Sequence, residues 1–135
     1  MTSDSTLRQD VYSAVRTLIN TDKSSYGASA TPALIGGYPD LSTITFPCIA
    51  FPNVNIGKSE STFGTSMKST ISVMFILFAK KNEDLDKMSD GIDNSITTNT
   101  WSGFTLVDSS EDDAFITPND QKIKSKTLSY TFIRR

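Results

Sequence analysis

The stretch that decides the fold is residues 68–81, KSTISVMFILFAKK, the most apolar segment of the chain. Its uninterrupted apolar part runs only from Val73 to Ala79 and ends at two lysines. A membrane-spanning helix needs about 20 apolar residues, and the hydrophobic region of a signal peptide lies near the N-terminus. The segment is too short for the first and misplaced for the second, so we predict a buried strand.

This strand is apolar on both faces. Its residues are mostly β-branched or aromatic, which favours a strand, and side chains alternate between the two faces. One face carries Ile71, Val73, Phe75 and Leu77, and the other carries Met74, Ile76 and Phe78. We expect both faces to be covered, by the same domain or by a second subunit. The pattern is a first indication of assembly.

The composition is that of one folded domain spanning residues 1–135. A chain of this length buries about two-thirds of its unfolded surface. With 13 basic and 15 acidic residues the net charge is −2, which gives no overall attraction to nucleic acid or anionic lipid. The single cysteine, Cys48, fits a reducing intracellular setting, and its apolar neighbours indicate a small buried side chain rather than a nucleophile.

The sequence contains no histidine. This removes the commonest general base and the commonest transition-metal ligand. We therefore expect no enzymatic activity, no cofactor and no metal site. Asp86, Asp90 and Asp93 share a polar side of a predicted helix, but hard-cation sites usually draw on loop carbonyls as well, so we interpret them as solvated.

Two amphipathic helices are predicted. In residues 5–20 the apolar side chains recur at helical spacing: Leu7, Val11, Ala14, Val15, Leu18 and Ile19. In residues 82–99 a narrower stripe follows the same spacing: Leu85, Met88, Ile92 and Ile96. Such stripes are typical of helices that pack one face onto a sheet.

Two segments before the central strand contain several prolines or glycines. Residues 29–40, SATPALIGGYPD, are predicted to be a loop, and they lack the lysine spacing of a phosphate-binding loop. Residues 42–56 are predicted to be a strand that is bent or lies at an edge, because Pro47 and Pro52 cannot donate ladder hydrogen bonds.

Residues 57–69, GKSESTFGTSMKS, are polar and lie between two apolar strands, which predicts the tip of a long hairpin. One interpretation is a surface loop with a single exposed aromatic side chain. The other is an arm that becomes ordered on a partner, with Phe63 as its anchor. The sequence leaves both open.

A short strand is predicted from Phe104 to Val107, followed by an acidic turn. The turn contains Asp108, Glu111, Asp112 and Asp113, which lack the order of a calcium-binding loop, so we interpret it as solvated.

The last strand, residues 121–135, places Lys122, Lys124 and Lys126 on the same face as later core residues. We expect these lysines to lie in solvent or against a partner. A row of lysines also protects an edge strand from aggregation, which we favour over contact with DNA phosphates.

Together these elements predict an α+β fold with a mainly antiparallel sheet, two helices on one face and a long hairpin arm. In size and element order the chain resembles the tail-terminator (tail-completion) proteins of long-tailed bacteriophages and related archaeal viruses. The resemblance covers nearly the whole chain. It depends on the opening helix and on FPCIAF (46–51), TISVMFILFA (70–79), LDKMSDGIDNSI (85–96) and TLSYTFIRR (127–135).

The resemblance implies a structural virion protein, made in the host cytoplasm and located in the tail or neck. Such proteins form a ring, usually hexameric, that caps the tail tube, ends its growth and joins it to the head–tail connector. DNA passes through the lumen without sequence-specific binding, and no membrane is involved. Subunit or tube contacts are expected at Phe63, Lys122, Lys124 and Lys126.

Two alternatives remain open at this point. A head–tail adaptor or stopper protein of the same virus region has much the same pattern. A small cytosolic enzyme or ligand-binding domain would instead need a deep pocket with two titratable groups, such as Asp90 and Asp93 or a lysine of depressed pKa.

Overall fold

The computed structural model describes residues 4–37, 43–52, 54–60, 67–101, 103–116 and 123–134. The helical elements are α1 (Asp4–Asp22), the short 3₁₀ helix η1 (Lys23–Ser25) and α2 (Asn82–Thr98). The strands are β1 (Ala33–Ile35), β2 (Cys48–Ala50), β3 (Val54–Glu60), β4 (Met67–Ala79), β5 (Phe104–Ile116) and β6 (Ile123–Arg134).

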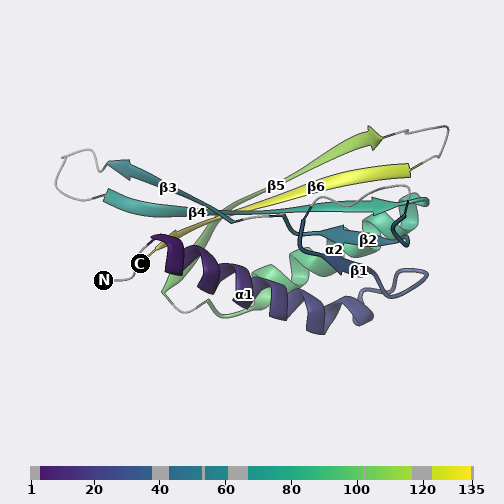
Figure 1. Cartoon of the computed structure of the whole chain (residues 1–135), viewed down its shortest axis with the longest axis horizontal. Helices are drawn as coiled ribbons and strands as arrows, with labels where there is room; N and C mark the ends of the chain where they lie inside the picture. The colour runs from purple at the N-terminus through teal and green to yellow at the C-terminus, as the bar shows by residue number, and fades with distance from the viewer. Residues whose placement is uncertain are drawn as a thin grey trace.

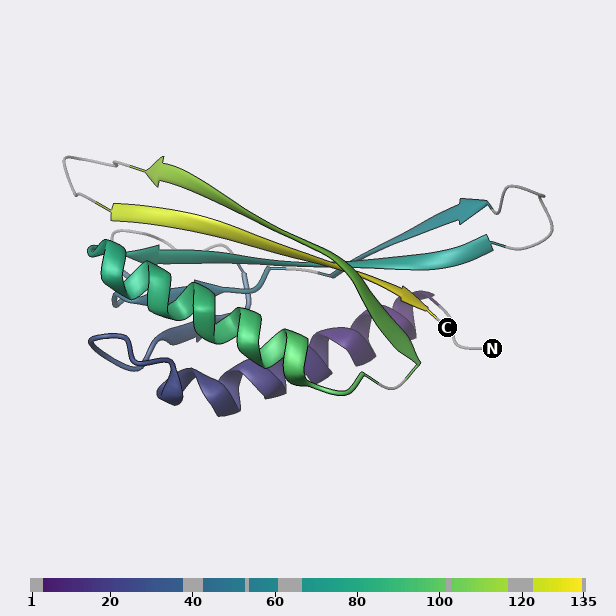
Figure 2. The same ribbon diagram turned by 180° about the vertical axis from the view of Figure 1, so that it is seen from behind.

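The strands form one mixed sheet in the order β1-β2-β4-β6-β5, and β3 pairs with the first part of β4. Only the β1–β2 pair is parallel; the other described pairs are antiparallel. Both helices lie against the same face of this sheet, as Figures 1 and 2 show from opposite sides. The predicted α+β class, with a mainly antiparallel sheet and two helices on one face, is therefore confirmed.

The core lies between the helices and β4. The face of β4 that meets them is fully buried: Ile71, Val73, Phe75 and Leu77. The helices contribute the stripes that their spacing predicted, and the buried members are Leu7, Val11, Val15, Ile19, Leu85, Met88, Ile92 and Ile96. The prediction that residues 68–81 form a buried strand is correct, because burial of two helical stripes requires an apolar surface of this length.

The opposite face of β4 is covered only in part. Near its end, Phe78 packs with Cys48, Ala50 and Ile123 in a second, smaller cluster. Residues 43–47 contribute Ile44 and Phe46 to that cluster, so the chain itself covers this end of the face. Further along, Met74 and Ile76 are half-buried, and the predicted two-sided burial is only partly correct.

The segments rich in proline and glycine contain more strand than predicted. Ala33–Ile35 forms β1 inside the segment 29–40 that was expected to be a loop. Segment 42–56 is interrupted at Pro52, between β2 and β3, which fits the predicted bend. However, β2 lies inside the sheet between β1 and β4, because Pro47 precedes the strand and takes no ladder position.

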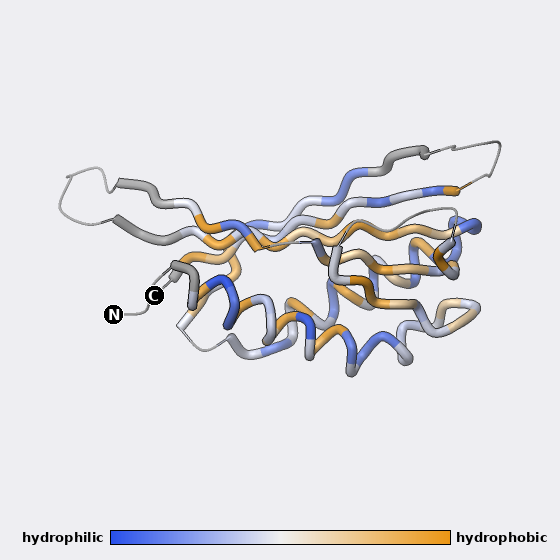
Figure 3. Tube along the Cα trace, in the orientation of Figure 1, coloured by the Kyte–Doolittle hydropathy of each residue, from blue (hydrophilic) through white to orange (hydrophobic). Residues whose placement is uncertain are grey.

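The acidic turn predicted after Val107 is wrong. Residues 108–113 belong to β5, which continues to Ile116 and pairs with β6 along its whole length except at an irregularity between Leu106 and Asp108. β5 is largely hydrophilic in Figure 3. Its strand conformation is imposed by pairing with β6, since tertiary context overrides the low strand propensity of aspartate.

Two hairpins point in opposite directions (Figure 1), and the one formed by β3 and β4 extends beyond the helices. One is made of β3 and the start of β4, and its last described register pair is Glu60 with Met67, in the segment predicted to form the arm. The other is made of the end of β5 and the start of β6, which pair through Ile116 and Ile123. No helix of the described residues is long and apolar enough to cross a membrane.

Candidate assembly surfaces

The structure separates the four side chains that the sequence predicted as contacts. Phe63 and Lys122 lie outside the described residues. Lys124 is half-buried on β6, between Ala79 of β4 and Phe115 of β5. Lys126 is buried, with 9% of its surface exposed. The predicted row of lysines is therefore not one solvent-facing surface.

Lys126 belongs to an internal network and is not exposed to solvent, while its predicted contact with a partner stays a prediction. Its ammonium group pairs with the carboxylate of Glu111 on β5 and lies 3.4 Å from Oδ1 of Asp86 on α2. Ser89 Oγ donates to Glu111 Oε1 at 3.0 Å. The hydrogen bond from Lys126 lowers the pKa of Glu111. The network joins α2, β5 and β6, because β6 is an inner strand and not the edge strand that was predicted.

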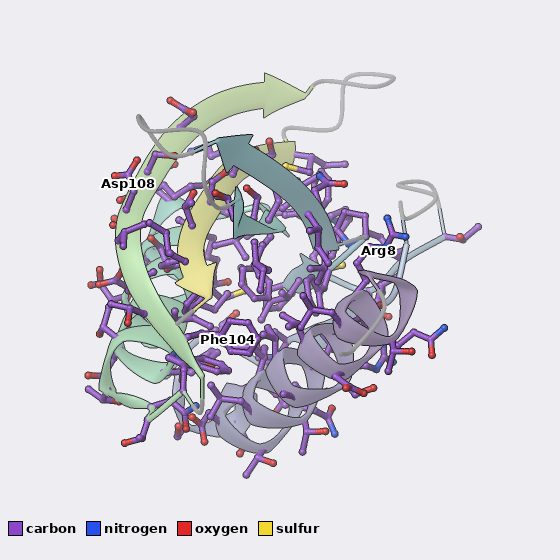
Figure 4. All side chains as sticks on the ribbon, turned by 90° about the vertical axis from the view of Figure 1, so that its left-hand side faces the viewer. Arg8, Phe104 and Asp108 are labelled. Atoms are coloured by element: carbon purple, nitrogen blue, oxygen red, sulfur yellow. The ribbon has the colours of Figure 1, made fainter. Side chains whose placement is uncertain are left out.

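The edge next to this network is acidic. β5 pairs with β6 on one side, and no other described strand pairs with its outer side. Exposed carboxylates follow this edge and the neighbouring side of α2: Asp86, Asp90, Asp93, Asp108, Glu111 and Asp112. Together they form what we call the acidic edge. In Figure 4, Asp108 points away from the molecule on this side.

A polar groove of about 330 Å³ lies between α2 and β5. Its walls include Asp90, Asp93 and Glu111, and Tyr130 forms part of its floor. The Tyr130 hydroxyl donates to Asp93 Oδ1 at 3.3 Å, and burial raises the pKa of Tyr130. Among the described residues no group of three or more acidic, cysteine or histidine side chains has a metal-binding arrangement.

The opposite edge of the sheet, formed by β1 and β3, lies beside a basic side of α1. Tyr12 stacks on Phe51 with ring centroids 4.4 Å apart, and its hydroxyl donates to the carbonyl oxygens of Gly36 and Phe51. Arg16 Nη1 donates to the Tyr12 hydroxyl at 3.4 Å. Arg8, one turn before Tyr12, shares this side of the helix. We call Arg8 and Arg16, which are both exposed, the basic edge.

An apolar cavity of about 590 Å³ lies between α1 and the connection from α2 to β5. Its floor is the cross-strand pair Ile71 and Phe132, and Trp101 and Phe104 form its far wall. Asp10 is the titratable side chain among its lining residues. Asp90 and Asp93, the two groups that the enzyme alternative names, line the polar groove and not this cavity.

Cys48 is buried in the smaller apolar cluster. Burial raises the pKa of its thiol to about 11, so the thiolate is scarce near neutral pH. The prediction of a small apolar side chain is confirmed. The acidic edge was missed because Asp108, Glu111 and Asp112 were assigned to a turn and not to a strand beside α2. The sequence signal for a long β5 was the length of the last strand, β6. Its 12 residues need a neighbouring strand of similar length.

Comparison with known proteins supports the fold. One chain of the solved structure "Virion of native gene transfer agent (GTA) particle" superposes with a TM-score of 0.61 at 8% sequence identity, over 91% of this chain and 92% of that one. No protein-family profile matches the sequence. No curated protein matches it either. The fold is therefore shared over nearly the whole length of both chains, at an identity that carries no information about individual residues.

Proposed function

We propose that this chain is a structural virion protein that forms a ring of six subunits on the end of a tail tube. The ring ends tube growth and joins the tail to the head–tail connector. The role needs no catalytic group. The observation that carries the proposal is the superposition, over 91% of the chain, on a chain of a gene transfer agent virion.

The architecture supports assembly in a ring. Among the described strands the sheet has two different outer edges, β5 on one side and β1 with β3 on the other. A contact between two different surfaces is heterologous, and it closes into a ring when the rotation between neighbours permits. Extension of a sheet from one subunit to the next satisfies the backbone groups that an edge strand leaves unpaired.

The face of the sheet away from the helices supports passage of DNA. Short hydroxyl side chains occupy its centre and are half-exposed: Thr70, Ser72, Thr127, Ser129 and Thr131. None of these side chains neutralises a phosphate, and the acidic edge adjoins them, so a lumen lined by this face would not retain a polyanion. The proposed DNA contact is therefore passage without sequence-specific binding.

We also propose that the two projecting hairpins contact ring neighbours or the tube. Phe63 belongs to the tip of one arm by sequence, and Lys122 and Lys124 belong to the other. Phe63→Ser and Lys124→Ser should each weaken ring or tail assembly. Lys87→Ser is a matched control, because Lys87 is exposed on α2, where it lines the hollow beside η1. Assembly that is unchanged in both arm variants would remove this part of the proposal.

The experiment that tests the function is a tube-assembly assay with purified tail-tube protein. Tubes assembled with this chain should be shorter, and electron microscopy should find a ring at one end. Tubes of unchanged length without a terminal ring would contradict the capping role. Binding to the connector alone would instead identify a head–tail adaptor or stopper.

A further inference from the structure

The two outer edges of the described sheet differ in charge. The β5 edge and the adjoining side of α2 carry only carboxylates among their exposed charged residues Asp86, Asp90, Asp93, Asp108, Glu111 and Asp112. The Lys126 ammonium that balances two of them is buried beneath the surface. The opposite edge has the exposed guanidinium groups of Arg8 and Arg16 beside it.

These two charged surfaces lie on opposite sides of the molecule. Figure 4 places Asp108 of β5 on the left and Arg8 of α1 on the right. A subunit can therefore present its acidic edge to one neighbour and its basic edge to another at the same time. This is the geometry that a head-to-tail assembly requires.

We propose that the acidic edge of one subunit docks against the basic edge of a second copy of this chain. This inference rests on the proposed ring function and specifies which surfaces meet. β5 then extends the sheet of its neighbour at the β1–β3 side, and carboxylates such as Asp90 and Asp112 face Arg8 and Arg16 of that neighbour.

The charges explain why the contact is head-to-tail rather than two-fold symmetric. In a two-fold dimer, β5 would pair with the β5 strand of a second copy and bring two acidic edges together. Like charges that face each other oppose such pairing, so repulsion disfavours contact between two acidic edges. The irregularity between Leu106 and Asp108 also disrupts regular pairing on this edge. A partner edge with cations meets no such repulsion.

Exposed ion pairs contribute little to affinity, so the charges act mainly on specificity and orientation. The backbone hydrogen bonds of the β5 edge and the contacts of the two hairpins must supply the rest. If the charges set the specificity, reversal of charge on either edge should block association. Complementary reversals on the two edges should restore it.

The test uses two variants of the full chain. Asp90→Lys with Asp112→Lys makes both edges basic, and Arg8→Glu with Arg16→Glu makes both edges acidic. We expect each variant alone to self-associate about a hundredfold more weakly than the wild type, from like-charge repulsion. An equimolar mixture should recover the wild-type mass in light scattering, because the two variants alternate around the ring.

Controls keep the outcome interpretable. Thr17→Lys with Thr21→Lys adds lysines to exposed positions of α1 that line the apolar cavity, and it should leave association unchanged. Circular dichroism verifies folding. If a reversal variant fails to fold, the neutral variants Asp90→Asn with Asp112→Asn and Arg8→Gln with Arg16→Gln replace it and should weaken association less.

A wild-type oligomer that both reversals leave intact, or a mixture of weakened variants that stays monomeric, would overturn the assignment of edges while the ring itself stands. A wild-type chain that never associates, at any soluble concentration or on tail-tube protein, would overturn the ring and this inference together. The wild-type measurement therefore separates the two failures.

Discussion

A single strand, β4, differs in its surroundings along its length. From Thr70 to Ala79 it pairs with β6, and its inner face lies on the helices. From Met67 to Ser69 it pairs with β3 alone, in the hairpin that extends beyond the helices. The first part is buried and determines stability. The second pairs with a single described strand and lies beyond the helices, which suits a surface for contacts between subunits.

The largest expected effect is in the buried part of β4. Phe75→Ala should lower the free energy of unfolding by about 3–5 kcal/mol, because the fully buried ring packs against Phe51 and Tyr130 and leaves a cavity. Met74→Ala is the matched control on the other face, where the side chain is half-buried, and should cost about 1 kcal/mol. Urea unfolding measures both. Equal losses would contradict the difference between the faces.

Two glycines sharpen the same comparison. A Cβ on Gly91 of α2 would lie 2.2 Å from Cδ1 of Tyr26, whereas one on Gly57 of β3 would meet nothing within 4 Å. Gly91→Ala should destabilise by about 1–3 kcal/mol despite the helix preference of alanine. Gly57→Ala should leave the unfolding temperature nearly unchanged. If the unfolding temperature of Gly91→Ala equalled or exceeded that of the wild type, Tyr26 would have room to move.

A third prediction concerns acid stability. Asp84 is 6% exposed and accepts hydrogen bonds from Ser29 N at 2.9 Å and Ser29 Oγ at 2.7 Å. These bonds, the backbone one first, lower the pKa of Asp84. Its contribution to stability is therefore present above the unfolded pKa of about 3.9 and is lost as pH falls through the lower folded pKa.

Asp84→Asn should cost about 1–2 kcal/mol at pH 7, since a bond to a charged group is replaced by a weaker one. The difference between the wild type and this variant should shrink below about pH 4. Urea unfolding at a series of pH values measures it. A difference that stays constant down to the acid limit would show that the charge of Asp84 does not contribute.

The smallest expected effect is the difference in stability loss between substitutions of Lys126 and Lys124, the two lysines of β6. Lys126→Gln should cost about 1 kcal/mol, a value discounted because Glu111 and Asp86 are 51% and 68% exposed and their pairing is screened. Lys124→Gln should stay within about 0.5 kcal/mol. A double-mutant cycle of Lys126 with Glu111→Gln should find coupling between them, and its absence would show that the pair is not energetically linked.

Much of the fold could be predicted from the sequence because the deciding patterns are apolar and local. The stripes of α1 and α2 and the run from Val73 to Ala79 identify two helices and a central strand, and the structure confirms all three. The resemblance to phage tail-terminator proteins predicted the same layout. The comparison with a virion chain agrees with it at the level of the fold.

The errors occur where pairing between distant segments overrides local preference. Asp108, Glu111 and Asp112 are poor strand residues, yet they lie in β5 because β6 needs a partner of its own length. Lys126 was expected on an exposed row because nothing local reveals that α2 covers it. Its ion pair with Glu111 joins residues of two strands, and a pattern of single residues does not record such a pairing.

The central claim is that copies of this chain assemble into a ring that caps a tail tube. The most direct test is the native mass of the wild-type protein by light scattering, alone and mixed with tail-tube protein. The account predicts a species of six subunits, either free or bound to the tube. A protein that stays monomeric in both conditions would contradict it.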